Sequence, residues 1–158
     1  MKKLLFIVLF ALTNLSATAQ TVKLFDTYLK ADNSETRYVV VLTDNTIWWF
    51  APGDEWKKSS TTGLPDKSIK FISCYSNSDG STRYVVVLED NSIWWFAPGD
   101  AWKKSSIDGL PSGYSIAHFE AYSKKDGTRY TAVLRDGTVW WFAPGNPWKK
   151  SSMAGLPE

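Results

Sequence analysis

The chain has few of the residue types that catalysis or disulfide pairing needs. Its 158 residues include one cysteine, Cys74, and one histidine, His118. A single cysteine excludes a disulfide framework within the chain. No Ser-His-Asp set, HExxH motif, paired-carboxylate motif or phosphate-cradling glycine loop accompanies the histidine. We therefore expect a protein that is not an enzyme and that has no cofactor and no metal site.

An excess of charge of one sign is also missing. Lysine and arginine number 18 against 16 aspartates and glutamates, but two of the lysines are Lys2 and Lys3 at the extreme amino terminus. Without these two, the basic and acidic residues balance at 16 each. Binding to nucleic acid depends on neutralising phosphates with positive charge. We therefore expect no nucleic-acid partner.

The amino-terminal segment has the pattern of a secretory signal. Lys2 and Lys3 precede an apolar run from Leu4 to Leu12, and Ala17-Thr18-Ala19 supplies small residues before Gln20. The run is too short to span a membrane as a helix. The sequence predicts a signal peptide over residues 1–19 and a mature protein that is periplasmic or secreted to the medium, without membrane insertion.

The rest of the chain is three near-copies of one segment, which begin 46 residues apart at Thr36, Thr82 and Thr128. The copies read TRYVVVLTDNTIWWFAPGDEWKKSSTTGLP, TRYVVVLEDNSIWWFAPGDAWKKSSIDGLP and TRYTAVLRDGTVWWFAPGNPWKKSSMAGLP. A period of this size is typical of repeat architectures. We expect one repeat domain over residues 20–158, with units at about 21–65, 66–111 and 112–158.

Each unit reads as four antiparallel strands. In the middle unit, they are expected at Ile69 to Tyr75, Arg83 to Glu89, Ser92 to Ala97 and around Trp102 to Ser106. By alignment of the units, Val22 to Tyr28 supplies the first strand of the first unit. The strands are rich in valine and aromatic residues, and polar loop residues separate them.

The turn residues indicate tight hairpins. Asp90-Asn91 and Asp136-Gly137 predict two-residue type I′ turns, because asparagine and glycine tolerate a positive φ. Pro98-Gly99 predicts a type II turn, with proline setting φ and glycine in the left-handed position.

Two all-β architectures suit three such units, a β-propeller and a β-trefoil. Three units in one chain favour the trefoil, since propellers typically have four to eight blades. The strand pattern favours the propeller: Trp94 and Trp95 must point to opposite faces, so both faces of the strand need cover. Three blades do not close a ring, and the simplest closed solution is a homodimer with six blades.

The order of these elements resembles a known blade pattern. The repeat runs from Trp through six residues to Gly-Leu-Pro, and then through an apolar strand, a loop, a valine-rich strand, Asp-Asn or Asp-Gly and an aromatic strand. This order resembles the blades of tectonin-type and fucose-lectin-type β-propellers. The pattern is also similar to the chromosome-condensation-regulator repeat. The resemblance covers nearly all of residues 22 to 157 and implies a propeller, although three units are fewer than those families have.

Repeated surface residues suggest binding of a carbohydrate. Sugars present apolar C–H faces and hydroxyl edges, which suit a flat indole beside a forked guanidinium. The candidate ligand-binding residues are Arg37, Trp56, Arg83, Trp102, Arg129 and Trp148. The indoles could instead be packing between blades. The sequence thus predicts a lectin-like glycan-binding protein, with a structural or protein-interaction propeller of the cell envelope, without a small ligand, as the alternative.

Overall fold

The computed structural model describes residues 20–32 and 34–157, and its regular structure there is β-strand throughout. The signal peptide predicted for residues 1–19 lies outside the described residues. Within them, no helix is long and apolar enough to cross a membrane.

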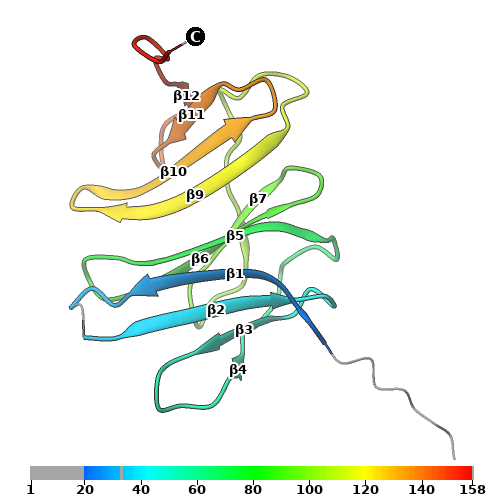
Figure 1. Cartoon of the computed structure of the whole chain (residues 1–158), viewed down its shortest axis with the longest axis vertical. Helices are drawn as coiled ribbons and strands as arrows, with labels where there is room; N and C mark the ends of the chain where they lie inside the picture. The colour runs from blue at the N-terminus through cyan, green and yellow to red at the C-terminus, as the bar shows by residue number, and fades with distance from the viewer. Residues whose placement is uncertain (1–19, 33, 158) are drawn as a thin grey trace, which may run out of the picture.

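Each repeat folds into one four-stranded antiparallel sheet whose strands follow chain order (Figure 1). We call these sheets the first, second and third blade. The first blade contains β1 (Val22–Leu29), β2 (Thr36–Leu42), β3 (Ile47–Phe50) and β4 (Lys57–Lys58). The second contains β5 (Ile69–Ser76), β6 (Thr82–Leu88), β7 (Ile93–Phe96) and β8 (Lys103–Lys104). The third contains β9 (Ile116–Lys124), β10 (Gly127–Leu134), β11 (Val139–Phe142) and β12 (Lys149–Lys150).

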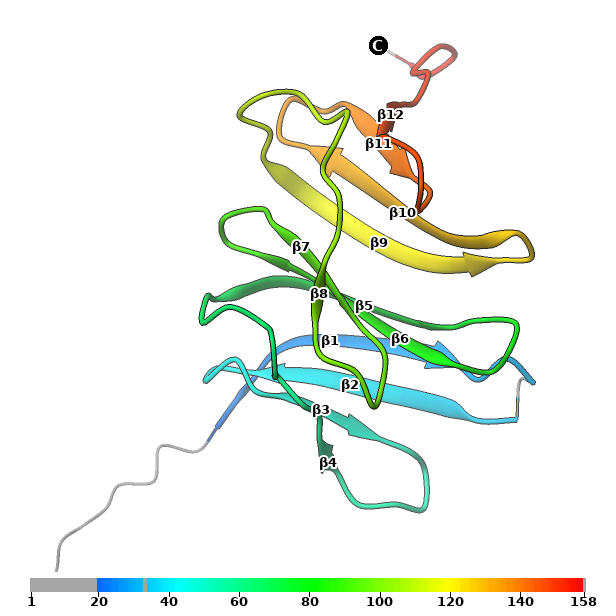
Figure 2. The ribbon, with the colours of Figure 1, turned by 180° about the vertical axis from the view of Figure 1, so that it is seen from behind.

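The three blades stack along the long axis of the molecule, with the second between the other two (Figures 1 and 2). The first strands of the blades, β1, β5 and β9, are neighbours in space. This arrangement is propeller-like, as predicted. The trefoil alternative is wrong, because hydrogen bonds join the four strands of each repeat into a separate sheet.

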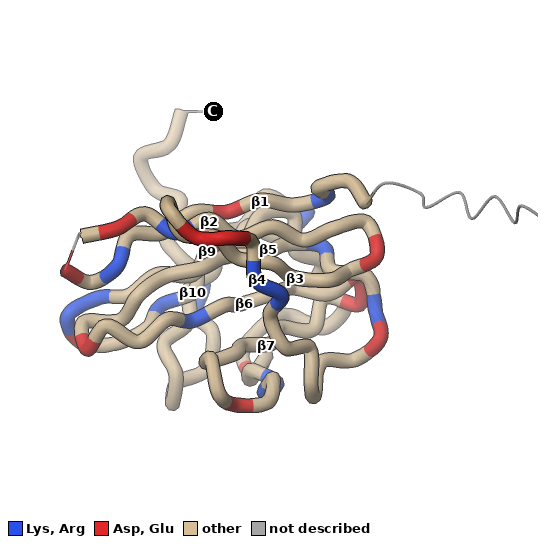
Figure 3. Tube along the Cα trace, turned by 90° about the horizontal axis from the view of Figure 1, so that it is seen from below, with Lys and Arg blue, Asp and Glu red and all other residues tan. Residues whose placement is uncertain are grey.

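The core lies between blades rather than within one sheet, which explains the apolar pattern on both strand faces. On β6, Val85 and Val87 pack toward the third blade, and Val86 and Leu88 pack toward the first. All four side chains are fully buried. Charged residues lie mainly in the turns and near strand ends (Figure 3). A middle blade therefore needs two apolar faces, as the paired tryptophans indicated.

The Pro-Gly turn is as expected, but the other hairpin is not. Gly99 has a φ of +97°, and the Asp100 N–H donates to Ala97 O at 2.9 Å, which fits a type II turn. In the Asp-Asn turn only Asn91 has a positive φ, +61°, whereas a type I′ turn needs two such residues. The loop is instead a three-residue type I turn with a bulge. The Asp90 carboxylate holds it by accepting the N–H of Ser92 at 2.9 Å.

Cys74 is a buried small residue on β5, and burial raises the pKa of its thiol well above the usual value. Its positions in the other blades, by strand register, are Thr27 and Ala121. Three small residues therefore occupy one position of the repeat, where Cys74 and Ala121 pack against the blade before them and Thr27 is exposed.

Candidate functional site

The two junctions between blades each contain a pocket, and the two pockets are built from equivalent residues. The pocket between the second and third blades has a volume of about 370 Å³, and the one between the first and second about 380 Å³. These volumes lie at the small end of the range for ligand pockets. The first is lined by Tyr75, Arg83, Trp95, Lys104, Ser105, Ser106, Thr128, Tyr130, Phe142, Pro144 and Gly145. The second is lined by Tyr28, Lys30, Arg37, Trp49, Lys58, Ser59, Ser60, Thr82, Tyr84, Phe96, Pro98 and Gly99.

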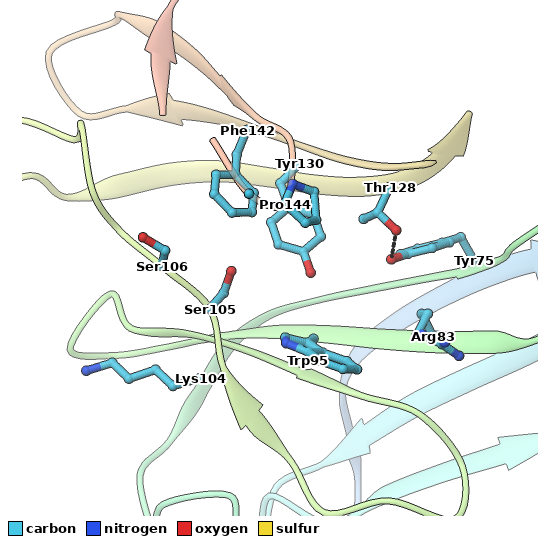
Figure 4. A pocket seen from close by; sticks show the side chains of 11 residues that line it. Tyr75, Arg83, Trp95, Lys104, Ser105, Ser106, Thr128, Tyr130, Phe142 and Pro144 are labelled. Carbon is cyan, nitrogen blue, oxygen red and sulfur yellow. Dashed lines mark hydrogen bonds between the residues drawn. The ribbon is translucent and has the colours of Figure 1, made fainter. Parts of the chain in front are cut away.

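One wall of the pocket between the second and third blades comes from strands β5 to β7. Tyr75 pairs with Arg83 across β5 and β6, and Val85 pairs with Trp95 across β6 and β7. Arg83 and Val85 are two residues apart on one strand, so Arg83 and Trp95 share a sheet face. This places a guanidinium and an indole side by side along the base of the pocket (Figure 4).

The opposite wall contains two aromatic rings of the third blade, Tyr130 and Phe142, whose ring centroids are 5.4 Å apart. Behind this wall, outside the pocket lining, Trp148 stacks on Phe142 at 5.3 Å. The hydroxyl of Tyr130 points into the pocket (Figure 4). Burial raises the pKa of this hydroxyl far above its usual value, so it stays protonated and can donate a hydrogen bond. At one end the hydroxyls of Tyr75 and Thr128 form a hydrogen bond of 2.9 Å between the blades.

Two serine hydroxyls close the side of the pocket that follows β8. Ser105 and Ser106 lie where the chain leaves the second blade for the third (Figure 4). The backbone carbonyl of Ser106 accepts the indole N–H of Trp148 at 3.1 Å, which anchors this segment to the third blade. The pocket thus offers several hydroxyl groups around an indole.

The two pockets differ in the freedom of their arginines. Arg37 forms an ion pair of 2.8 Å with Glu35, and its guanidinium lies 5.2 Å from the ring centroid of Trp49. Among the described residues Arg83 has no such ion pair, and only Lys103 lies over the ring of Trp95, at 5.0 Å. One guanidinium nitrogen of Arg83, Nη1, donates to Thr82 O at 2.8 Å, and the other N–H groups of Arg83 remain available to a ligand.

The positive charge of the pocket between the second and third blades is not balanced within its lining. Arg83 and Lys104 line it, and no aspartate or glutamate does. A forked guanidinium binds carboxylate or sulfate groups through two hydrogen bonds. The pocket can therefore accept a ligand with an apolar face, hydroxyl groups and an anionic group.

The structure separates the six candidate residues predicted from the sequence. Arg37 and Arg83 line the two pockets. Trp102 and Trp148 are only 3 % exposed, each packed on a ring of its own blade, and they line neither of these two pockets.

The last two candidates lie on the end blades. Trp56 is 45 % exposed on the first blade. Arg129 lies on β10 of the third blade, where it pairs with Asp126 at 2.7 Å. Ligand binding by Trp56 and Arg129 stays a prediction.

The candidate residues chosen from the sequence do not include the second tryptophan of each pair or the serines after the Lys-Lys strand. The paired tryptophans were expected to need cover on both strand faces, but Trp49 and Trp95 line the two pockets. The alternation of side chains between the two faces of a strand was the signal that could have identified these tryptophans. Each lies on the same sheet face as the repeated arginine, since Val39 pairs with Trp49 and Val85 with Trp95.

No group of three or more histidine, cysteine or acidic side chains in the described part of the chain could hold a metal ion. His118 is exposed on β9, and by strand register its counterparts in the other blades are Leu24 and Phe71. It therefore belongs to no repeated set of residues.

The fold and its pockets define a propeller-like repeat protein with a ligand-sized pocket at each blade junction. No family model matches the chain, and a search of curated proteins finds no match. Among solved structures, the chain is similar to a fucose lectin from Kordia zhangzhouensis in complex with methyl-fucoside. The identity is 14 %, and the likeness covers 81 % of this chain and 97 % of the lectin chain. At a TM-score of 0.49 this likeness assigns no ligand to the chain.

Proposed function

We propose that this protein is a non-enzymatic carbohydrate-binding protein whose sites are the pockets between blades. The observation that carries the proposal is the pairing of Arg83 with Trp95 in a pocket that hydroxyl groups surround. An indole packs against the C–H face of a sugar ring, while hydroxyl and guanidinium groups bond its edge. The same arrangement recurs with Arg37 and Trp49, which fits a repeated site with avidity.

The charge of the lining favours an acidic sugar. Because no carboxylate lines the pocket of Arg83, a uronic acid satisfies the guanidinium better than a neutral hexose does. We therefore expect methyl glucuronide to bind more tightly than methyl fucoside or methyl galactoside. We propose further that binding takes place outside the cytoplasm, following the signal peptide predicted for residues 1–19.

Titration calorimetry with the three methyl glycosides tests this proposal. Arg83→Ala should weaken binding of methyl glucuronide at its pocket about 10- to 100-fold, because a charged hydrogen-bonding group is lost. Arg83→Lys should recover only part of the affinity, since it keeps the charge and loses the fork. Arg135→Ala is the matched control, because Arg135 is an exposed arginine outside both pocket linings. If none of the three glycosides binds at millimolar concentration, the proposed function fails.

We propose that two copies of the chain form a closed dimer of six blades. Propellers have four to eight blades, and six is the multiple of three within that range. The outer face of the first blade carries exposed apolar side chains. Phe25 on β1 is 59 % exposed, whereas its counterpart Ile72, packed against the first blade, is 9 % exposed. Light scattering at micromolar concentration should give twice the chain mass, and a monomer would contradict this assembly.

A further inference from the structure

The two junctions inside the chain are joined by the same hydrogen bonds. At the first junction, the indole N–H of Trp102 donates to Ser60 O at 2.8 Å and its backbone N–H donates to Thr62 O at 2.9 Å. At the second, Trp148 makes the equivalent bonds to Ser106 O at 3.1 Å and Asp108 O at 2.6 Å. Each junction is thus made by a tryptophan of one blade and the loop that follows the Lys-Lys strand of the blade before.

A tyrosine and a threonine form a second repeated link between blades. The hydroxyl of Tyr28 bonds that of Thr82 at 3.2 Å, and the hydroxyl of Tyr75 bonds that of Thr128 at 2.9 Å. In both junctions this pair lies in the pocket lining. The pocket is therefore part of the junction, and any surface that repeats the junction repeats the pocket.

The ends of the chain carry the two separate halves of this junction. Trp56, the counterpart of Trp102, is 45 % exposed on the first blade, and Tyr122, the counterpart of Tyr75, is 41 % exposed on the third. Leu156, which corresponds to Leu64 and Leu110, is 62 % exposed, whereas those two leucines pack against the core between blades. Each half has the side chains of a junction, and within residues 20–32 and 34–157 neither half contacts its complement.

The glycine of the Gly-Leu-Pro segment shows the same difference. A methyl group added to Gly109 would clash with the backbone of Trp148, and one added to Gly63 would touch the backbone of Trp102. The same addition to Gly155 would meet nothing within 4 Å. The space above Gly155 is the place that a tryptophan from another blade takes at the other two junctions.

Resting on the proposed function and its dimer, we propose that a second copy of the chain completes a further glycan site. We call the surface between the third blade of one chain and the first blade of the other the seam. The third blade supplies Tyr122, Arg129, Trp141, Ser151 and Ser152 to the seam pocket, the counterparts of Tyr75, Arg83, Trp95, Ser105 and Ser106. The opposite wall comes from Thr36 of the partner subunit, Tyr38 of the partner subunit, Phe50 of the partner subunit and Pro52 of the partner subunit. Each chain then contributes to three kinds of pocket instead of two.

The seam differs from the internal junctions away from the pocket. Inside the chain, the side-chain oxygens of Asn45 and Asn91 accept the N–H groups of Ile69 and Ile116, at 3.2 and 3.0 Å. At the corresponding place in the third blade stands Gly137, which has no side chain to do this. The tryptophan link and the tyrosine–threonine link remain available, and both border the pocket. The seam therefore lacks the asparagine link but keeps both links at the ligand-binding end.

Two variants of the third blade test the seam. Gly155→Ala places a methyl group where the backbone of the partner's Trp56 has to approach, and Thr131→Asp puts an unpaired charge into the middle of the seam. Gly80→Ala is the control, because Gly80 has a similar φ, +81° against +88°, and open space around it, but lies in a loop of the second blade. Light scattering gives the mass of each variant, and calorimetry with the tightest binder of the three methyl glycosides gives its number of sites.

Wild type and Gly80→Ala should be dimers that bind three equivalents of sugar per chain. Gly155→Ala and Thr131→Asp should be monomers that bind two. A wild-type dimer with two equivalents per chain would overturn the seam site and leave the proposed function intact. A wild-type monomer would overturn it too, as would three equivalents in the monomeric variants. Absence of all sugar binding would instead overturn the proposed function, and the seam site with it.

Discussion

Replacing Trp148 by alanine should destabilise the fold rather than remove a ligand contact. Its indole is 3 % exposed, stacks on Phe142 at 5.3 Å and donates a hydrogen bond to Ser106 O. Burying an indole removes about 200 Å² of surface from water, worth about 5 kcal/mol at 25 cal/mol per Å². The lost hydrogen bond adds about 1 kcal/mol, and partial collapse of the cavity offsets part of the total. We expect a loss of about 4 kcal/mol in the free energy of unfolding.

Trp56 provides the matched comparison, because it is the same residue of the repeat at the free end of the chain. It is 45 % exposed, so Trp56→Ala should cost roughly half as much, about 2 kcal/mol. Both variants are made in the Gly155→Ala background, in which the seam is blocked, and urea unfolding is followed by tryptophan fluorescence. A loss below about 1 kcal/mol for Trp148→Ala, or equal losses for the two variants, would refute the packing role of this tryptophan.

Three further predictions concern single positions. Gly109→Ala should lower the unfolding temperature more than Gly155→Ala in dilute monomeric protein. Both glycines have a positive φ, but only Gly109 lies against the backbone of Trp148. Equal shifts in unfolding temperature would contradict this close approach of the two backbones. The pKa of Asp44 lies below 3.8, because its carboxylate accepts hydrogen bonds from the side chain and the backbone N–H of Thr46. These bonds should therefore stabilise the fold above pH 3.8, and this stabilisation should be lost as the pH falls through the pKa that Asp44 has in the folded protein. Urea unfolding from pH 7 to pH 2 checks this, and an Asp44→Asn variant with an unchanged pH profile would count against it. Cys74 should resist a thiol reagent in native protein and react on unfolding, because burial raises the pKa of its thiol; rapid labelling at pH 8 would show that it is accessible.

Strand positions could be predicted from the sequence because each blade repeats the same apolar and turn signals. The predicted strand Ile69 to Tyr75 and the observed strand Ile69–Ser76 differ by one residue. The fourth strand was predicted around Trp102 to Ser106 but contains only Lys103–Lys104. It is short because the chain turns away after β8 to reach the next blade, which pattern alone does not reveal. The bulged turn at Asn91 was missed because Asp-Asn occurs in both kinds of hairpin.

The candidate site was harder to predict than the strands. The arginines at the start of the second strand of each blade were predicted to bind a ligand, and two of them, Arg37 and Arg83, line the pockets between blades. The sequence could not divide the tryptophans between pocket and packing, because an indole has the same sequence signal in either place. The position of the neighbouring blade decides whether a tryptophan is packed or borders a pocket. Trp102 and Trp148 face the blade before them and are covered, whereas Trp49 and Trp95 border the space that the blades leave open.

The most direct test of the central claim, that the pockets between blades are the binding sites, is an NMR titration of the indole N–H signals with methyl glucuronide. We expect the signal of Trp95 to shift most, that of Trp49 to shift as well, and that of Trp141 to shift in the dimer. The signals of Trp102 and Trp148, which donate hydrogen bonds behind the pockets, should move little. Large shifts confined to the exposed Trp56, or none at Trp95 when sugar is bound, would contradict the account.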